Sequence, residues 1–233
     1  TTEGITVRLL GGAAVALSAG APLPEPLRRT YKDLDYVVVR RDARRWADLV
    51  EAHGYRADRG FNSLHGAHRL LHVDTSNARQ LDTFVATFAM CHSIDLEKRL
   101  PADSATLAPE DLLLTKLQIF EVNDKDLVDA AALLLSHPVS DDGSPRIDRG
   151  RLVDVVGSDW GWHTTISDNI AKVAQRVPTL GLTDDESQVV SDRITAVADI
   201  LASCPKTLRW RARAALGRRV PWYDLPEEVD QPG

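Results

Sequence analysis

The sequence lacks several features that mark particular classes of protein. It has two cysteines, Cys91 and Cys204, which lie far apart and form no Cys-x-x-Cys pair. We therefore expect neither a disulfide framework nor a cysteine zinc site, and the composition favours a reducing compartment. No run reaches the roughly 18–20 uncharged apolar residues that a membrane span needs. Because the apolar segment 7–17 has no basic leader or cleavage pattern, we interpret it as core and expect a cytoplasmic protein without membrane contact.

Basic residues are in the minority. The chain has 28 Lys and Arg against 34 Asp and Glu, which gives a net charge of -6. This balance is not typical of a nucleic-acid-binding protein, although it is compatible with a local basic patch. Hydrophobic residues make up 43% of the 233 residues, which is ordinary for a globular protein and sufficient for a substantial core.

The first half of the chain mixes strand-like and helix-like segments. We expect strands at 5–10, 34–40, 69–75 and 80–88, where β-branched and aromatic residues are frequent. Helices are expected at 13–19, 42–53, 109–120 and 124–136. The proline-rich stretch 21–27 (APLPEPL) cannot continue a helix and is interpreted as a loop.

The second half is predicted to be all-helical, with helices near 148–156, 159–176, 183–203 and 205–216. The loop 137–146 is rich in turn residues and is the expected domain boundary. This order predicts an α+β fold, with a mixed sheet and flanking helices followed by an all-α region. We place one domain at 1–138, a helical domain at 147–220 and an extended tail at 221–233.

Two short motifs near the start of the chain carry chemistry. Gly11 and Gly12 stand between a strand and a helix, where backbone N–H groups can receive a phosphate. Asp33 and Asp35 enter a strand, in which residues i and i+2 point to one face. Adjacent carboxylates are costly unless a cation joins them, and Mg²⁺ is a natural choice. The alternatives without a functional role are a purely structural turn at Gly11 and Gly12, and a solvent-exposed strand start at Asp33 and Asp35.

A third carboxylate, Asp82, lies in an otherwise apolar and threonine-rich strand. An isolated charge beside Phe84 should not be buried without a partner. The partner is either a metal ion or an arginine in a salt bridge. Together with the two motifs, Asp82 completes the inventory for phosphoryl transfer with two metal ions.

These residues resemble a known family. The segments LLGGAAVAL and RRTYKDLDYVVV look like the signature of the DNA polymerase β-like nucleotidyltransferase superfamily, and most resemble its AbiEii-type and MenT-type toxin branch. The resemblance covers about residues 5–136 and implies a nucleotidyltransferase-type N-terminal domain. It also implies a helix-borne lysine and a later aspartate, which TLAPEDLLLTKLQIF and NDKDLVDAAALL supply.

The resemblance implies a role for each matching residue. The implied metal ligands for Mg²⁺ or Mn²⁺ are Asp33, Asp35 and Asp82. The implied nucleotide-binding residues are Gly11, Gly12, Thr30, Lys32 and Lys116. Asp126, with Asp129 one turn later, would position the nucleotide or act as a base. From the residues alone, Lys116 extending to solvent and Asp126 stabilising a helix start are nearly as plausible.

The implied reaction moves a nucleoside monophosphate from an NTP to an acceptor hydroxyl, with release of pyrophosphate. The acceptor could be RNA such as tRNA, a protein, or a small molecule. One version is the toxin of a toxin–antitoxin pair, with an antitoxin protein as partner. The alternatives are a non-catalytic relative that binds a nucleotide or a protein, and an antibiotic-type nucleotidyltransferase that acts on a small molecule.

Basic and aromatic residues are interleaved in the segment 206–223. Arginines and tryptophans in this pattern can contact phosphates and stack on bases. The other interpretation is that the aromatic residues pack against the fold or a subunit while the arginines are solvated. The sequence leaves both open.

Overall fold

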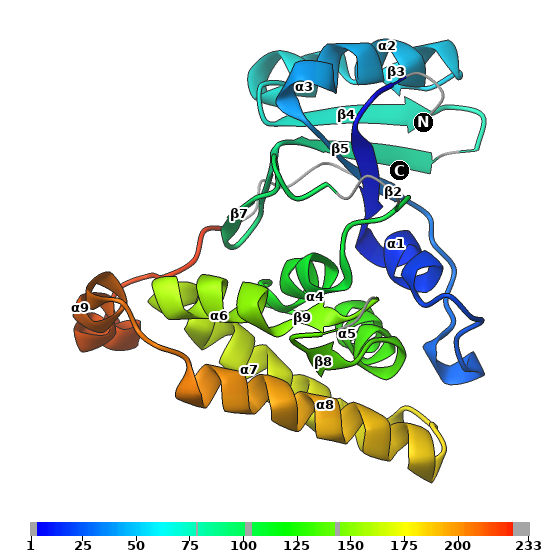
Figure 1. Cartoon of the computed structure of the whole chain (residues 1–233). Helices are drawn as coiled ribbons and strands as arrows, with labels where there is room; N and C mark the ends of the chain where they lie inside the picture. Colours follow the sequence, from blue (N-terminus) through cyan, green and yellow to red (C-terminus); the bar gives the residue numbers. More distant parts are fainter. Residues whose placement is uncertain (1–3, 78, 101–103, 143–144, 226–233) are drawn as a thin grey trace.

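The fold is a mixed β-sheet at one end and a group of helices at the other (Figure 1). The computed structural model describes residues 4–77, 79–100, 104–142 and 145–225. The sheet has five strands in the order β1-β2-β5-β4-β3, and only the β2–β5 pair within it is parallel. The α+β class predicted from the sequence is confirmed.

The strands are short and match most of the predicted segments. Those of the main sheet are β1 (Val7–Leu10), β2 (Leu34–Val38), β3 (Arg56–Ala57), β4 (Arg69–Asp74) and β5 (Arg79–Val85). Two small pairs lie outside it: the hairpin β6 (Thr87–Ala89) and β7 (Ser93–Asp95), and the parallel pair β8 (Val139–Ser140) and β9 (Ile147–Asp148).

Helices make up most of the rest of the chain. Those of the first half are α1 (Gly11–Ser18), α2 (Ala43–Ala52), α3 (Arg59–His65), α4 (Pro109–Leu117) and α5 (Asp124–Ser136). Those of the second half are α6 (Arg149–Ser158), α7 (Trp160–Arg176), α8 (Asp184–Ser203) and α9 (Leu208–Leu216). Short 3-10 helices cover Glu25–Leu27, Arg40–Asp42, Val177–Thr179 and Gly217–Arg219. No helix in the described ranges is long and apolar enough to cross a bilayer.

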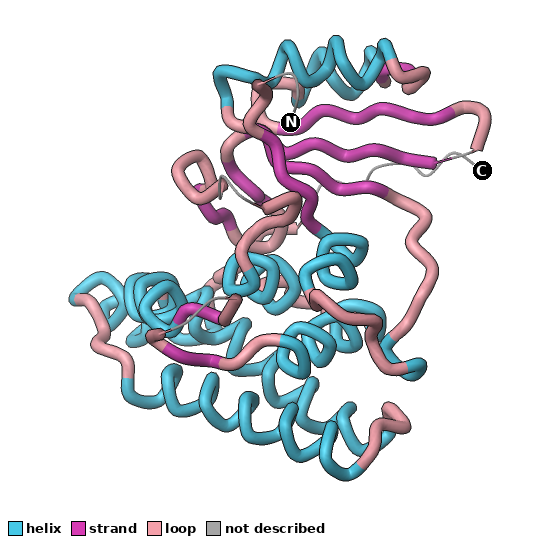
Figure 2. Tube along the Cα trace, turned by 45° about the vertical axis from the view of Figure 1, so that its right-hand side comes forward, coloured by secondary structure: helices cyan, strands magenta, loops and turns pink. Residues whose placement is uncertain are grey.

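The alternation of side chains along the sheet creates two apolar layers. On one face, Val38 and Leu81 pack with Trp46 of α2, whose indole N–H donates to Thr83 Oγ1 at 2.9 Å. On the other face, Val37 and Phe84 join the core formed with α1, α4 and α5. Figure 2 shows the same arrangement from another side, with helices above and below the sheet. The carboxylates of interest lie on the second face, toward the helices.

One continuous core runs from the sheet through α8. It contains Leu113 of α4, Leu133 of α5, Ile166 of α7 and Ile194 of α8. The expected boundary loop, residues 137–146, contains β8, and β9 follows directly after it. The domain limits stay a prediction, and the end of the predicted tail, residues 226–233, lies outside the described residues.

The strand expected at 80–88 is interrupted. Ala86 has a φ of 65°, in the left-handed region, and separates β5 from β6. Such a conformation is uncommon for a residue other than glycine and ends the ladder there. Helix α3, strand β3 and the β6–β7 hairpin were not predicted from the sequence, because these elements are too short for a clear periodic pattern.

Candidate functional site

Asp35 and Asp82 lie side by side at the same level of the sheet. They are register partners on the parallel strands β2 and β5. On its other side, Asp35 is paired with Leu10, the last residue of β1 and the residue that precedes α1. The fold thus brings two of the predicted carboxylates and the glycine turn together.

The two glycines are needed because other side chains approach them closely. Gly11 has a φ of +72°, and a Cβ added to it would lie 2.0 Å from Asp35 Oδ2. A Cβ on Gly12 would lie 1.8 Å from Arg29 Nη2 and 2.9 Å from Tyr31 Cε1. The start of α1 therefore contacts the Asp35 carboxyl on one side and the Arg29–Tyr31 segment on the other.

The negative charge of Asp35 is poorly compensated. The side chain is half-buried, and its pKa is raised from 3.8 to about 7. Burial is the largest cause, followed by the charge of Asp82, while Lys116 and Arg69 act in the opposite direction. A shift of this kind, in a cleft, is common at functional sites because a cation or substrate is the missing partner.

Asp82, in contrast, has a partner in Arg69 of β4. Arg69 Nε donates to Asp82 Oδ1 at 2.9 Å and to Oδ2 at 3.0 Å, and Arg69 Nη2 also donates to Oδ2. Asp82 is buried, at 5% exposure. The arginine alternative therefore describes the contacts of Asp82 in this structure. Arg69 was not identified from the sequence, although it alternates with Leu70 and so faces the same side as Asp82.

Lys116 belongs to a buried ionic cluster. Its Nζ lies 2.7 Å from Asp126 Oδ1 and 2.9 Å from Asp129 Oδ2. Arg29 also bonds Asp129, with Nη2 at 2.6 Å from Oδ2 and Nε at 2.9 Å from Oδ1. Burial alone would lower the pKa of Lys116, but the two carboxylates more than offset it and the pKa is raised. The Lys116 side chain thus does not extend into solvent, and Asp126 is its direct partner.

A cavity of about 520 Å³ opens in front of Asp35. The described residues that line it are Gly12, Arg29, Thr30, Tyr31, Lys32, Asp33, Asp35, Val73, Arg79, Gln80, Lys116 and Lys125. Gly11, Asp82 and Asp126 adjoin these residues without lining the cavity themselves. The fold therefore gathers Thr30, Lys32, Asp33 and Lys116, all candidates from the sequence, around Asp35.

Three cations on the rim of this cavity are exposed. Lys32, Arg79 and Lys125 form no salt bridge with any residue that the structure describes. Neither Arg79 nor Lys125 was identified from the sequence, because their approach depends on the strand order and on the position of α5. Free cations around a carboxylate pair suit a ligand that carries several phosphates.

The residues around Asp35 fit a magnesium ion that arrives with a nucleotide. Within the described ranges, no three His, Cys, Asp or Glu side chains form a group that could hold a metal ion. Mg²⁺ is usually held by one or two carboxylates, waters and substrate phosphates. Asp33 and Asp35 line one cavity and supply two carboxylates, and the pKa of Asp35 is raised by burial and by the neighbouring charge of Asp82. Asp82 could join them through a carboxylate that also accepts hydrogen bonds from Arg69.

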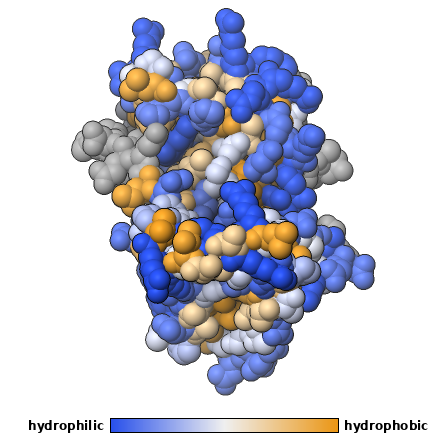
Figure 3. Space-filling view, turned by 90° about the vertical axis from the view of Figure 1, so that its left-hand side faces the viewer, coloured by the Kyte–Doolittle hydropathy of each residue, from blue (hydrophilic) through white to orange (hydrophobic). Residues whose placement is uncertain are grey.

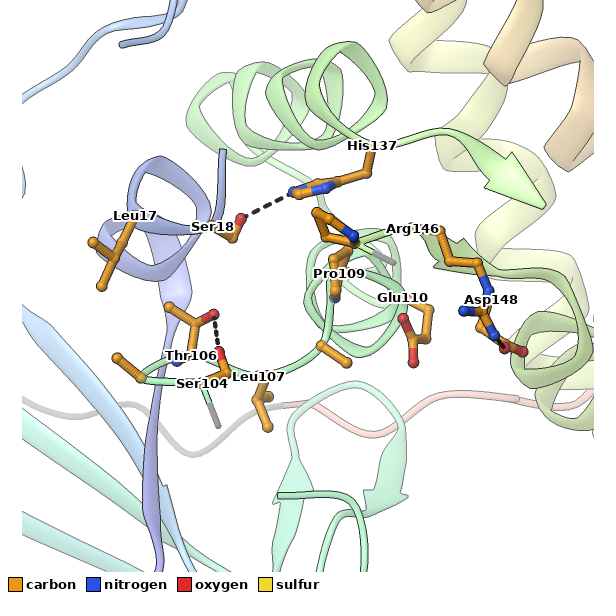
Figure 4. A pocket seen from close by; sticks show the side chains of 13 residues that line it. Leu17, Ser18, Ser104, Thr106, Leu107, Pro109, Glu110, His137, Arg146 and Asp148 are labelled. Atoms are coloured by element: carbon orange, nitrogen blue, oxygen red, sulfur yellow. Dashed lines mark hydrogen bonds and ion pairs between the residues drawn. The ribbon is translucent and has the colours of Figure 1, made fainter. Parts of the chain in front are cut away.

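A second cavity, of about 460 Å³, lies at the other end of α1 (Figure 4). Leu17 and Ser18 line it, and Ser18 Oγ lies 3.3 Å from His137 Nε2. Its acidic side chains have partners. Arg99 Nη2 donates to Glu110 at 2.6 Å, and Arg146 Nη2 donates to Asp148 at 2.7 Å.

Comparison with known proteins gives one weak likeness. No family model matches the chain, and no curated protein matches it. Among solved structures, the lincomycin-bound lincosamide antibiotic adenylyltransferase LnuA is similar, with a TM-score of 0.42 and 14% identity over 57% of this chain and 87% of that chain. A likeness of this strength does not show a shared family or activity. The resemblance to the AbiEii-type and MenT-type branch stays a prediction.

Proposed function

We propose that this chain is a magnesium-dependent nucleotidyltransferase, which moves a nucleoside monophosphate from an NTP to an acceptor hydroxyl and releases pyrophosphate. The observation that carries the proposal is the cavity in front of Asp35, where two carboxylates meet cations from separate segments. The carboxylates suit a divalent cation, and the cations suit a triphosphate.

In this proposal, Asp33 and Asp35 hold the metal ion. Asp82 is the third ligand, through a carboxylate that also accepts hydrogen bonds from Arg69. When bound, Mg²⁺ (or Mn²⁺) lowers the pKa of the acceptor hydroxyl and neutralises phosphate charge. These roles require Asp35 to be ionised, which a cation beside it favours.

The nucleotide phosphates lie against the start of α1. Gly11 and Gly12 are the first residues of α1, and backbone N–H groups at a helix N-terminus stabilise anions. Thr30 and Lys32, in the segment that precedes β2, contact the nucleotide. Lys116 contributes positive charge from α4. Asp126 acts by positioning Lys116, since its carboxylate bonds Lys116 Nζ at 2.7 Å.

The test is a transfer assay with a matched pair of variants. The purified protein is incubated with Mg²⁺ and each labelled NTP, together with total RNA including tRNA, a protein extract, a pool of small hydroxyl compounds, or no acceptor. We expect pyrophosphate release and label in one acceptor pool. The label should be lost in Asp35→Asn and retained in Asp148→Asn, which changes a carboxylate of the second cavity that is already paired with Arg146.

The outcomes separate the remaining versions of the proposal. Label in a small-molecule pool indicates an antibiotic-type enzyme, whereas label in tRNA and growth arrest on expression, relieved by Asp35→Asn or by an antitoxin, indicate a toxin. NTP binding without transfer to any pool contradicts the enzyme and favours a binding protein. Full turnover by Asp35→Asn contradicts the metal site.

A further inference from the structure

Helix α9 is attached to the molecule by one face only. On that face, Trp210 meets His163 of α7 edge-on with ring centroids 5.2 Å apart, and the guanidinium of Arg213 lies 4.7 Å from the centre of the Trp160 ring. Arg213 also donates to the carbonyl oxygens of Gly217 and Val220 at 2.8 and 2.7 Å. These contacts fix the orientation of α9, yet none of its residues is buried.

The opposite face of α9 carries an apolar stripe. Leu208, Ala212, Ala215 and Leu216 follow the spacing i, i+4, i+7 and i+8, which places them on one side of a helix. All four are exposed, Leu208 at 83% and Leu216 at 52%. Figure 3 faces the side of the molecule where α9 lies in Figure 1, and it shows apolar and hydrophilic side chains mixed there.

The stripe is flanked by positive charge. The segment from Lys206 to Tyr223 contains six basic residues and no acidic one, in a chain whose net charge is -6. Three of these cations are engaged within the fold, namely Lys206, Arg213 and Arg218. The other three, Arg209, Arg211 and Arg219, are exposed and form no salt bridge in the part of the chain that the structure describes.

The aromatic rings beside α9 are poor platforms for nucleic-acid bases. Tyr223 is stacked on Phe120 with ring centroids 3.8 Å apart. Trp160 and Trp222 are each covered by an arginine, Arg213 and Arg218 respectively. Base stacking needs an open ring face. The packing interpretation of segment 206–223 therefore accounts for these rings better than base contact.

Charge and apolar area distinguish the remaining candidates for the surface that covers the stripe: a second copy of α9, a lipid surface and a helix of another protein. A second copy of α9 would place arginines against arginines, which is repulsive. A lipid surface binds a helix in proportion to the apolar area inserted. The large apolar side chains of the stripe are only Leu208 and Leu216, which disfavours a membrane as the occupant. We propose that the outer face of α9 docks an acidic amphipathic helix of another protein, with its apolar side on Leu208 and Leu216 and its carboxylates on Arg209, Arg211 and Arg219.

The test measures binding of a synthetic amphipathic peptide with leucines at helical spacing and glutamates between them, by fluorescence anisotropy with the full chain. We expect saturable, salt-sensitive binding that weakens about tenfold or more in the double variant Leu208→Ser/Leu216→Ser. The triple variant Arg209→Gln/Arg211→Gln/Arg219→Gln should have a similar effect. Leu64→Ser is the matched control, because Leu64 is 80% exposed on α3, and binding should be unchanged.

Several results would overturn the proposal. One is peptide binding that neither set of variants changes. Another is the absence of peptide binding together with binding to phosphatidylglycerol vesicles or to single-stranded RNA. A third is peptide binding that appears only after residues 226–233 are removed, since Glu227, Glu228 and Asp230 would then be the occupant.

Discussion

The two cavities at the ends of α1 are similar in size, but their carboxyl groups differ in the partners that the fold gives them. In front of Asp35, about 520 Å³, a carboxyl with a pKa of about 7 faces cations that have no salt bridge to any described residue. At the other end, about 460 Å³, Glu110 and Asp148 are each bonded to an arginine. Charge that the fold leaves uncompensated is costly in an empty protein and is common where a charged ligand binds. We therefore assign the proposed function to the first cavity, whereas the carboxylates of the second are held by arginines of the fold.

The largest expected effect concerns activity. Asp35→Asn should reduce nucleotidyl transfer by about 10³-fold or more, because a neutral amide cannot replace a carboxylate as ligand of Mg²⁺. Asp148→Asn should change the rate by about twofold at most, since asparagine preserves the helix cap that Asp148 gives to α6. Initial rates of label transfer measure both. Equal losses in the two variants would remove the distinction between the cavities.

The next largest effect concerns stability. Replacing aspartate by asparagine should change the free energy of unfolding in opposite directions at the two cavities. Asp111, beside the second cavity, is fully buried and accepts from Arg99 Nε and Arg151 Nε, both at 2.9 Å. Asp111→Asn should lower the free energy of unfolding by about 3–5 kcal/mol, because it leaves two guanidinium groups short of a counter-charge. Asp35→Asn should raise it at pH 8. Urea unfolding of both variants gives the comparison, and a loss in Asp35→Asn would contradict it.

The pH dependence of stability should identify Asp35 more specifically. Its pKa is about 7 in the folded protein and 3.8 as a reference for the unfolded chain, so between these values the folded protein holds a proton that the unfolded chain has released. The wild type should therefore lose stability relative to Asp35→Asn as pH rises from about 4 to about 7. The total difference should be roughly 2–4 kcal/mol. Parallel stability curves for the two proteins would show that Asp35 has an ordinary pKa.

The smallest expected effect separates close approach from backbone strain. Gly11 and Gly20 have similar positive φ values, +72° and +70°, but a Cβ on Gly20 would meet nothing within 4 Å. Gly20→Ala should cost about 1 kcal/mol, the ordinary penalty for the left-handed conformation. Gly11→Ala should cost about 2–3 kcal/mol, because the new Cβ must also displace the Asp35 carboxyl. Equal losses in thermal unfolding would mean that Asp35 moves aside freely.

The sequence predicted those parts of the site that depend on local pattern. Local sequence pattern predicted the glycine turn between a strand and a helix, the strand that carries Asp35 and the strand that carries Asp82. Asp33 precedes β2, and its pairing with Asp35 stays a prediction. The long helices were also predictable, because their apolar positions recur over several turns. The α+β order followed from these elements.

The remaining features depend on contacts between distant segments. Asp35 and Asp82 are neighbours because β2 and β5 pair in parallel, which no local pattern specifies. The chain offers many arginines, and only the strand order makes Arg69 the partner of Asp82. Likewise, Lys116 is buried because α4 and α5 bring Asp126 and Asp129 to it.

The most direct test of the site is a pH titration of the Asp35 carboxyl group, monitored by ¹³C NMR. The Asp35→Asn variant assigns the signal. Spectra are recorded over a range of pH, first for the protein alone and then with Mg²⁺ and a non-hydrolysable NTP analogue. We predict a pKa of about 7 for the protein alone. With the metal and nucleotide, it should fall below about 5, because a bound cation favours the carboxylate. A pKa that stays near 7 while the nucleotide is bound would contradict the assignment of Asp35 as a metal ligand.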